Sequence, residues 1–573
     1  MKYFELHCKS NFSFLEGASH PDEMVRQAIQ LDYAGISLTD RNTLAGIIRG
    51  YAPAKDHSFP YIIGSELHLR DAPPMVVWCQ SRAGYANLCR LLSMGRMRAE
   101  KGSCDLTLSD LESMNNGLIA GLFFEHEQKD QSSGKSGGNS QLLRQIGSIR
   151  DIFGDRLYLL AHVHLGVDDV GHLQWLRQLQ QQTEVPRVAA GGAHYHAPER
   201  MLVHDLVTAI RNGTTIDAVH EQRLANSQYH LRSLKEIQRH YREEPQLIAA
   251  TEELAGRCDF RLSQLRFQYP EGLAPEGVSP IDHLRRLTWE GANQRWPGGV
   301  PQKIIDGLRH EMRLIEDLRY EPYFLTVWDI VRFARENNIL CQGRGSAANS
   351  MVCYCLGITN VDPSQNQLLF ERFISRERNE EPDIDVDFEH QRREEVLQYI
   401  YEKYGREHAG MTATVTTYRS RSAIREVGKA LGIAADKIDG LAKMSNAFSR
   451  EGKIAERAEL VDLDADSPTG QRFIYLVEQL MGFPRHLSQH VGGMVISRTA
   501  LCELCPIENA AMPGRTVIQW DKDDLEELGI LKIDVLALGM LSALRRSFDL
   551  KHAHGLRRAD HVIGRCVVWG DVG

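Results

Sequence analysis

Three aspartates alternate with apolar residues in the segment EPDIDVDF, residues 381–388. On a strand, Asp383, Asp385 and Asp387 would project from one face and the apolar side chains from the other. Carboxylates crowded on one face repel each other, and a bound divalent cation relieves that repulsion. An EF-hand loop is excluded, because it needs glycine where Phe388 stands. The pattern predicts a Mg²⁺ site for phosphoryl chemistry, with a strand of solvated acids as the alternative.

A second segment, LGILKIDVL at residues 528–536, carries Lys532 and Asp534 two positions apart on an otherwise apolar strand. Charged side chains in such a strand need partners. The two residues could form a structural ion pair. Alternatively, Asp534 joins the metal site as a third carboxylate and Lys532 reaches a phosphate.

A glycine-rich turn precedes the acidic segment. The sequence GRGSAANS, residues 343–350, is typical of a turn into a helix, with Ser346 as the predicted N-cap. Backbone N–H groups at a helix start can bind phosphate, and Arg344 adds positive charge. A plain turn is the alternative. Together the three segments favour nucleotidyl transfer, in which two Mg²⁺ ions activate a primer 3′-hydroxyl and stabilise the leaving pyrophosphate.

The elements that precede these segments alternate between strand and helix. Residues 35–40 and 61–66 each predict a buried strand that ends on a carboxylate, and residues 22–29 predict an amphipathic helix between strands. Strands that end on polar residues are typical of an α/β barrel with its site at the strand C-termini. The polar, Gly- and Ser-rich residues 125–141 predict a surface insertion. Between residues 260 and 280 the composition shifts, which indicates a domain boundary.

Length and composition narrow the class of protein. A chain of 573 residues predicts about four domains. We expect a cytoplasmic protein, because the sequence has no apolar run long enough to span a membrane and no secretory apolar segment near its start. The eleven cysteines are then reduced thiols, including the lone CxxC of residues 502–505. A net charge of −9 argues against a simple cationic coat for nucleic acid, but a local basic groove remains compatible with it.

Several longer segments resemble bacterial C-family DNA polymerases, the family of the replicative polymerase III alpha subunit. The resemblance rests on ELHCKSNFSFLEGASHP, GRGSAANSMVCYCLGITNVDP, LLFERFISRERNEEPDIDVDF and LGILKIDVLALGML. Two others, GFPRHLSQHVGGMVIS and PIENAAMPGRTVIQWDKDDLEELGILKIDVLALGML, are most similar to the error-prone, damage-inducible branch. The resemblance extends from Lys2 to about Leu550.

The resemblance implies a site for template-directed DNA synthesis. By motif, the three catalytic aspartates that hold two Mg²⁺ ions fall on Asp385, Asp387 and Asp534, whereas Asp383 is a less favoured ligand. The expected nucleotide-binding residues are Gly345, Ser346, Arg344, Arg372, Arg378 and Lys532. Apart from the resemblance, a set of basic residues could contact the DNA backbone, with a solvated basic face as the alternative: Arg419, Arg421, Arg425, Arg485 and His486.

The implied architecture is α/β and multidomain. It consists of an N-terminal distorted α/β barrel of the polymerase-and-histidinol-phosphatase (PHP) type, followed by a mixed α/β palm with an inserted helical thumb. The expected domains are a PHP domain at 1–262, a palm at 263–415 and 491–550, a thumb at 416–490, and a divergent tail at 551–573.

The PHP domain of such polymerases binds a metal cluster in some members. The ligand-like residues here are His7, Asp40, Glu66 and His194. Several positions depart from the family pattern: Glu5 and Gly192 stand where ligands are usual, and Arg41 replaces a frequent histidine. We therefore expect a mainly structural domain, in which residual Zn²⁺ or Mn²⁺ is a minor alternative.

The resemblance also implies partners, namely primer-template DNA, deoxynucleoside triphosphates, a sliding clamp and mutagenesis accessory proteins, in damage-induced mutagenesis and translesion synthesis. The clamp-binding region of the family lies outside this sequence, and residues 551–573 do not resemble the family, which predicts a truncation or frameshift. Two other functions stay open: an inactive fragment that only binds DNA or partners, and a PHP-type metal-dependent phosphoesterase.

Overall fold

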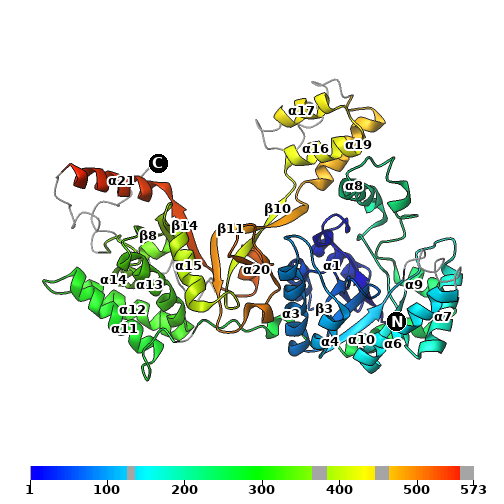
Figure 1. Ribbon diagram of the computed structural model, residues 1–573, viewed down its shortest axis with the longest axis horizontal. Coiled ribbons are helices and arrows are strands. Elements are labelled where there is room, and N and C mark those ends of the chain that lie inside the picture. The colour runs from blue at the N-terminus through cyan, green and yellow to red at the C-terminus, as the bar shows by residue number, and fades with distance from the viewer. Residues whose placement is uncertain (1, 125–135, 271, 364–383, 445–463, 555–573) are drawn as a thin grey trace. The chain divides into compact units, whose positions relative to one another are not determined.

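The computed structural model describes residues 2–124, 136–270, 272–363, 384–444 and 464–554, which form two compact units (Figure 1). The first, here called the barrel unit, comprises Met1–Leu265, Thr414–Ser488 and Cys502–Asn509. The second, here called the palm unit, comprises Arg266–Ala413, Gln489–Leu501 and Ala510–Gly573. The finer division into PHP domain, palm, thumb and tail stays a prediction.

The barrel unit contains a 7-stranded sheet whose strands follow one another in chain order, β1 to β7. The strands are β1 (Phe4–Cys8), β2 (Gly35–Leu38), β3 (Tyr61–Leu67), β4 (Met75–Cys79), β5 (Leu118–Leu122), β6 (Leu157–Ala161) and β7 (Arg187–Ala189). Just beyond β7, Ala193 bridges Cys8 of β1, and its N–H donates to the His7 carbonyl at 3.2 Å. The sheet therefore curls into a nearly closed barrel, as the sequence predicts.

Apolar side chains from almost every strand fill the barrel core. Trp78 of β4 is fully buried, and its indole N–H donates to the Leu6 carbonyl at 2.9 Å. The helix predicted at residues 22–29 is present as α1 (Pro21–Gln30), which buries Met24, Val25 and Ala28. The other helices of the barrel unit up to residue 265 are α2 (Ile47–Asp56), α3 (Arg82–Arg98), α4 (Leu108–Met114), α6 (Ser136–Phe153), α7 (Asp169–Thr183), α8 (Met201–Arg211), α9 (Leu234–His240) and α10 (Gln246–Gly256).

Three later helices of the barrel unit share one hydrophobic core with α8. They are α16 (Ser420–Ala430), α17 (Ala435–Met444) and α19 (Pro468–Leu480). Phe473 and Val477 of α19 share one hydrophobic core with Val203 and Leu206 of α8. This helical segment, predicted as the thumb, therefore has its apolar core in common with the barrel unit.

The palm unit is built on a mixed sheet in the order β13-β10-β11-β14-β9-β8. Its strands are β8 (Cys341–Arg344), β9 (Asp385–Glu389), β10 (Ala409–Thr417), β11 (Pro484–Ile496), β13 (Thr516–Ile518) and β14 (Ile533–Leu538). A short strand, β12 (Ile507–Asn509), belongs to the barrel unit. Strand β9 lies parallel to β14 and antiparallel to β8. Two segments far apart in the sequence thus become neighbours at the centre of the palm unit.

Helices of the palm unit bury apolar residues that recur along one helix face. In α12 (Gln302–Leu318), Ile304, Leu308, Met312 and Ile315 are buried, which is the spacing of one helix face. The others are α11 (Pro280–Arg295), α13 (Glu321–Glu336), α14 (Met351–Cys355), α15 (Arg393–Tyr404), α20 (Lys522–Glu527) and α21 (Gly539–Ala553). No helix within the described ranges is long and apolar enough to cross a membrane.

Candidate active site

The aspartates predicted from residue spacing meet on two adjacent strands. Asp385 and Asp387 belong to β9, and Asp534 belongs to β14, where it lies directly opposite Asp385. Opposite residues of neighbouring strands point to the same face, so the three carboxylates share one face of the sheet. Val386 is 1% exposed and packs on the other face. Asp383 lies outside the described residues.

Two cations neutralise these carboxylates. Arg344 of β8 places its Nε 3.0 Å from Asp387 Oδ2 and one guanidinium nitrogen 3.7 Å from Asp385 Oδ2. Lys532 Nζ lies 2.5 Å from Asp534 Oδ2, which is the ion pair that the sequence left open as a structural alternative. The site therefore balances clustered negative charge with side chains of its own.

The electrostatic environments of the aspartates differ. Burial raises the pKa of Asp387 above its ordinary value, and Arg344 only partly offsets this. Burial also opposes the ionisation of Asp534, but the Lys532 charge and hydrogen bond, together with a hydrogen bond accepted from Asp385, outweigh it and lower the Asp534 pKa. Asp534 is thus held as a carboxylate, whereas Asp387 retains a proton more readily.

The glycine-rich turn leads from β8 into a short 3-10 helix, Gly345–Asn349, beside the aspartates. Gly345 has φ +65°, a left-handed conformation that favours glycine, and a Cβ there would lie 3.6 Å from Asp385 Oδ2. The predicted N-cap at Ser346 is wrong, because Ser350 caps α14 by accepting from the Cys353 N–H at 3.0 Å. Ser350 follows the 3-10 helix Gly345–Asn349, and the sequence pattern did not predict this short helix.

Backbone N–H groups at the start of α14 already have an acceptor. The buried Glu311 carboxylate accepts from the N–H groups of Met351 at 2.9 Å and Val352 at 3.0 Å, and from the Ser350 hydroxyl at 2.8 Å. The start of α14 is therefore bound internally, and Gly345 is the part of the turn that lies beside the aspartates.

A cavity of about 810 Å³ opens beside the aspartates. Arg344, Gly345 and Asp387 contribute to its wall, and so does Arg393 at the start of α15, a cation that the sequence reasoning missed. The full lining is Gln342, Gly343, Arg344, Gly345, Ala348, Val361, Asp387, Arg393, Val491, Leu536, Ala537, Leu538 and Leu541. The cavity thus brings arginines, a carboxylate and apolar surface into one space large enough for a nucleotide.

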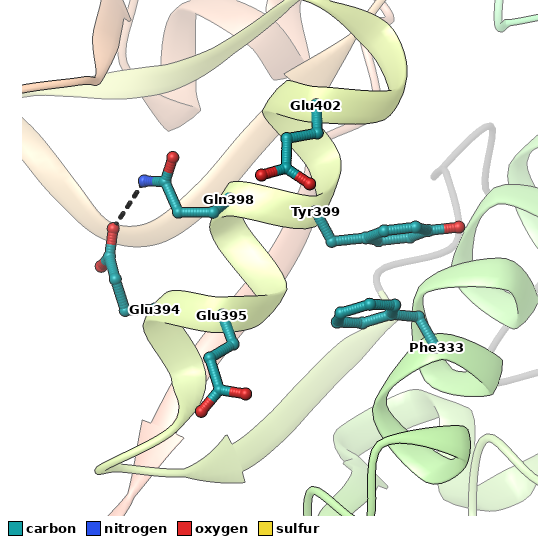
Figure 2. A pocket seen from close by; sticks show the side chains of 6 residues that line it. All are labelled: Phe333, Glu394, Glu395, Gln398, Tyr399 and Glu402. Atoms are coloured by element: carbon teal, nitrogen blue, oxygen red, sulfur yellow. Dashed lines mark hydrogen bonds between the residues drawn. The ribbon is translucent and has the colours of Figure 1, made fainter.

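A second cavity of the palm unit, about 320 Å³, lies between α13 and α15 (Figure 2). Phe333 of α13 and Tyr399 of α15 stack there with ring centroids 4.0 Å apart. Two of its three acidic residues have partners: Glu394 binds Gln398 and Arg515, and Glu395 binds Arg392. No predicted site residue lines this cavity.

In the barrel unit, the predicted ligands fall into separate groups. His7 Nε2 lies 2.8 Å from Glu66 Oε2, so these two residues do meet. The Asp40 carboxylate instead accepts from the Ser10 N–H at 2.7 Å and from the Ser13 hydroxyl at 2.6 Å. His194 forms its hydrogen bond with His204 at 3.2 Å.

Arg372 and Arg378 lie outside the described residues, and so does the side chain of Ser346. Their predicted contacts with a nucleotide stay predictions.

Known protein families match segments of both units. Residues 5–160 match the PHP domain, and residues 282–537 match the bacterial DNA polymerase III alpha NTPase domain. The chain is 59% identical over 556 residues to the error-prone DNA polymerase of Rhodopirellula baltica, which covers 97% of this chain. The chain combines a PHP domain with a bacterial DNA polymerase III alpha NTPase domain.

Other error-prone polymerases are also similar to this chain, at lower identity. The enzyme of Pseudomonas aeruginosa is 48% identical over 552 residues, and that of Alkalilimnicola ehrlichii is 47% identical over 548 residues. Each alignment covers 96% of this chain. The chain spans about half the length of these relatives, 48% for the Rhodopirellula protein and 52% for the other two.

Polymerase III alpha and PHP domains use divalent metals, and the palm residues fit such ions. The buried Asp534 Oδ1 has no hydrogen-bond partner among the described residues. Three carboxylates on one face supply the oxygen ligands that Mg²⁺ prefers. In the described ranges, no group of three or more His, Cys, Asp or Glu side chains is already arranged around an ion position. Because Arg344 is half exposed, it can leave its carboxylates when an ion binds.

The barrel residues do not fit a metal. The Lys9 ammonium lies between two carboxylates, 2.9 Å from Glu66 Oε1 and 3.0 Å from Glu16 Oε2. Asp40 faces its serine partners, and the ring nitrogens of His7 contact Glu66 and His162. A divalent ion would have to displace a buried positive charge.

Proposed function

We propose that this chain carries the catalytic core of an error-prone, template-directed DNA polymerase, which transfers a nucleotidyl group from a deoxynucleoside triphosphate to a primer 3′-hydroxyl. The observation that carries the proposal is the meeting of Asp385, Asp387 and Asp534 on adjacent strands beside a nucleotide-sized cavity. Three carboxylates from two distant segments repel each other on one face, and the two cations Arg344 and Lys532 offset only part of their charge.

The three aspartates would hold two Mg²⁺ ions, which supply charge stabilisation for in-line displacement at a phosphate. Lys532 keeps Asp534 ionised through its 2.5 Å contact, so that this carboxylate is ready to bind a cation. Arg344 exchanges its carboxylate partners for phosphate oxygens when a nucleotide enters the cavity. Other proposed phosphate contacts are Gly345, Ser346, Arg372, Arg378, Lys532 and Arg393.

We propose cytoplasmic DNA-damage-induced mutagenesis and translesion synthesis as the setting, with primer-template DNA as the substrate. A sliding clamp and mutagenesis accessory proteins are the proposed partners of the whole protein. These proposals rest on the similarity to error-prone polymerases, which exceed this chain in length about twofold.

Primer extension tests the function. The chain is incubated with primer-template, Mg²⁺ and all four nucleotides, beside Asp385→Asn/Asp387→Asn. We expect extension to fall at least about 1,000-fold in the double variant, because the metal ligands are lost while the side-chain shapes stay. The matched control is Asp306→Asn, an exposed aspartate of α12 in the same unit, which should extend normally.

Equal extension by wild type and the double variant would contradict the proposal. Absence of extension by a folded wild-type chain that still binds primer-template would favour the alternative of a non-catalytic binding fragment.

A further inference from the structure

Lys9 is the centre of a buried ion-pair network in the barrel unit. It follows β1, and its side chain is only 11% exposed. Its Nζ contacts Glu66, which is 1% exposed, and Glu16, which is 10% exposed. An ammonium between two buried carboxylates occupies the place that a cation takes in a metal site, because both need anionic oxygens from separate elements.

Side chains other than Lys9 also contact the two carboxylates. Glu16 Oε1 lies 2.5 Å from Arg41 and 3.6 Å from Arg211. Glu66 accepts from His68 at 2.5 Å and contacts His7 at 2.8 Å. Four separate side chains thus fix the two carboxylates around Lys9, so they keep their positions when the ammonium is removed.

We infer that the Lys9 ammonium takes the place of a divalent metal in the barrel, and that its removal opens a divalent-cation site on Glu16, Glu66 and His7. This inference does not depend on the proposed polymerase activity. It also predicts that this PHP domain lacks phosphoesterase activity, because a lysine supplies positive charge but neither activates water nor polarises a phosphate as a metal does.

The ammonium is the cation that these two carboxylates share, because it contacts both of them directly. Loss of the ammonium leaves two buried carboxylates close together with a neutral space between them, which is a strongly destabilising arrangement unless another cation enters.

Imidazole and carboxylate ligands suit Zn²⁺ or Mn²⁺, so Zn²⁺ is the probe. The full chain with Asp385→Asn/Asp387→Asn serves as the background, so that the palm site does not contribute to the bound metal. In this background, Lys9→Ala is compared with Lys2→Ala, which removes an exposed lysine that pairs with Glu252 at 2.8 Å. Metal content after desalting and the thermal midpoint with and without Zn²⁺ are measured.

We expect the Lys9→Ala chain to retain about one Zn²⁺ and to gain about 4 °C or more in Tm with Zn²⁺ present. The background and Lys2→Ala chains should retain no zinc and show no shift. If Lys9→Ala does not fold without metal, its refolding yield with and without Zn²⁺ gives the same comparison.

Three results would overturn the inference. One is zinc uptake by the background chain that Glu66→Gln abolishes, since the site would then be open with Lys9 in place. Another is equal zinc content and Tm shift in Lys9→Ala and Lys2→Ala. The third applies if Lys9→Ala does not fold without metal, and is a refolding yield that does not change with Zn²⁺.

Discussion

Tyr323 of α13 connects the two strands that carry the aspartates. Its hydroxyl is buried, accepts from the Ile384 N–H at 3.0 Å and donates to the Lys532 carbonyl at 3.4 Å. Ile384 directly precedes β9, and Lys532 directly precedes β14. One side chain therefore holds the beginnings of both strands and sets the distance between Asp385 and Asp534.

Replacement of Tyr323 by phenylalanine should reduce activity more than stability. The buried Ile384 N–H loses its partner, which costs about 1–3 kcal/mol. Small displacements of reacting groups are costly, so we expect kcat for primer extension to fall about 10- to 100-fold with little change in KM.

Steady-state extension kinetics and urea unfolding measure these effects. Tyr475→Phe, at an exposed position of α19, is the control and should leave both unchanged. Normal kcat in Tyr323→Phe would mean that the sheet alone fixes the strand starts.

The sequence could predict the aspartates of the site, but not the residues that hold their strands in place. Asp385 and Asp387 stand out because charge alternates with apolar residues at the period of a strand. Tyr323, by contrast, lies among apolar residues of a helix and is indistinguishable from an ordinary core position. Its partner Ile384 is 61 residues away in the chain, and a pattern of neighbouring residues carries no information about such a contact.

At the level of elements, α13 and α15 are joined by a charged cluster as well as by ring stacking. Asp329 is 2% exposed and accepts from Arg332 at 2.8 Å, Tyr399 at 2.7 Å and Lys403 at 2.5 Å. The Phe333 ring lies on Tyr399 beside this cluster (Figure 2). Because α15 directly follows β9 along the chain, this packing supports the strand that carries two of the aspartates.

Asp329→Asn should destabilise the palm unit by about 1–3 kcal/mol at pH 7, because Lys403 and Arg332 lose their buried counter-charge. Burial opposes ionisation of Asp329, but hydrogen bonds from Lys403, Arg332 and Tyr399 outweigh it and lower its pKa. A carboxyl whose pKa is lower in the folded state stabilises above its unfolded pKa and loses that contribution as pH falls through the folded pKa. The wild-type advantage should therefore be full at pH 7 and shrink below about pH 4.

Urea unfolding at pH 7 and at acid pH checks the direction of this change. Asp306→Asn, which removes an exposed charge from α12, should match wild type at both pH values. A difference between Asp329→Asn and wild type that grows on acidification would refute the assignment.

The helices and strands could be predicted from the sequence more readily than the way in which they pack against one another. The apolar spacing of α1 and α12 and the strands of residues 35–40 and 61–66 follow from local periodicity. Closure of the barrel through Ala193 does not, because it depends on one backbone bridge to Cys8 far along the chain. The shared core of Phe473 and Val203 was equally hidden, since each helix shows only that it has an apolar face.

On the scale of the whole molecule, a net charge of −9 means that the proposed DNA binding must come from local positive charge. Arg419 and Arg421, at the start of α16, are both exposed. Arg425 instead pairs with Asp439 at 3.0 Å, so it is less available for phosphate than the sequence suggests. Within the barrel unit, the first two arginines are thus the better candidates for contact with a DNA backbone.

Binding of primer-template should weaken steeply with salt, because each neutralised phosphate releases counterions. Arg419→Ala/Arg421→Ala should reduce the slope of log K against log salt by about one for each lost contact. Fluorescence anisotropy between about 50 and 200 mM salt measures this slope. The control is Arg239→Ala/Arg242→Ala, which removes two exposed arginines of the same unit near α9. Since both double variants change net charge equally, equal slopes would mean that overall charge, and not the start of α16, governs binding.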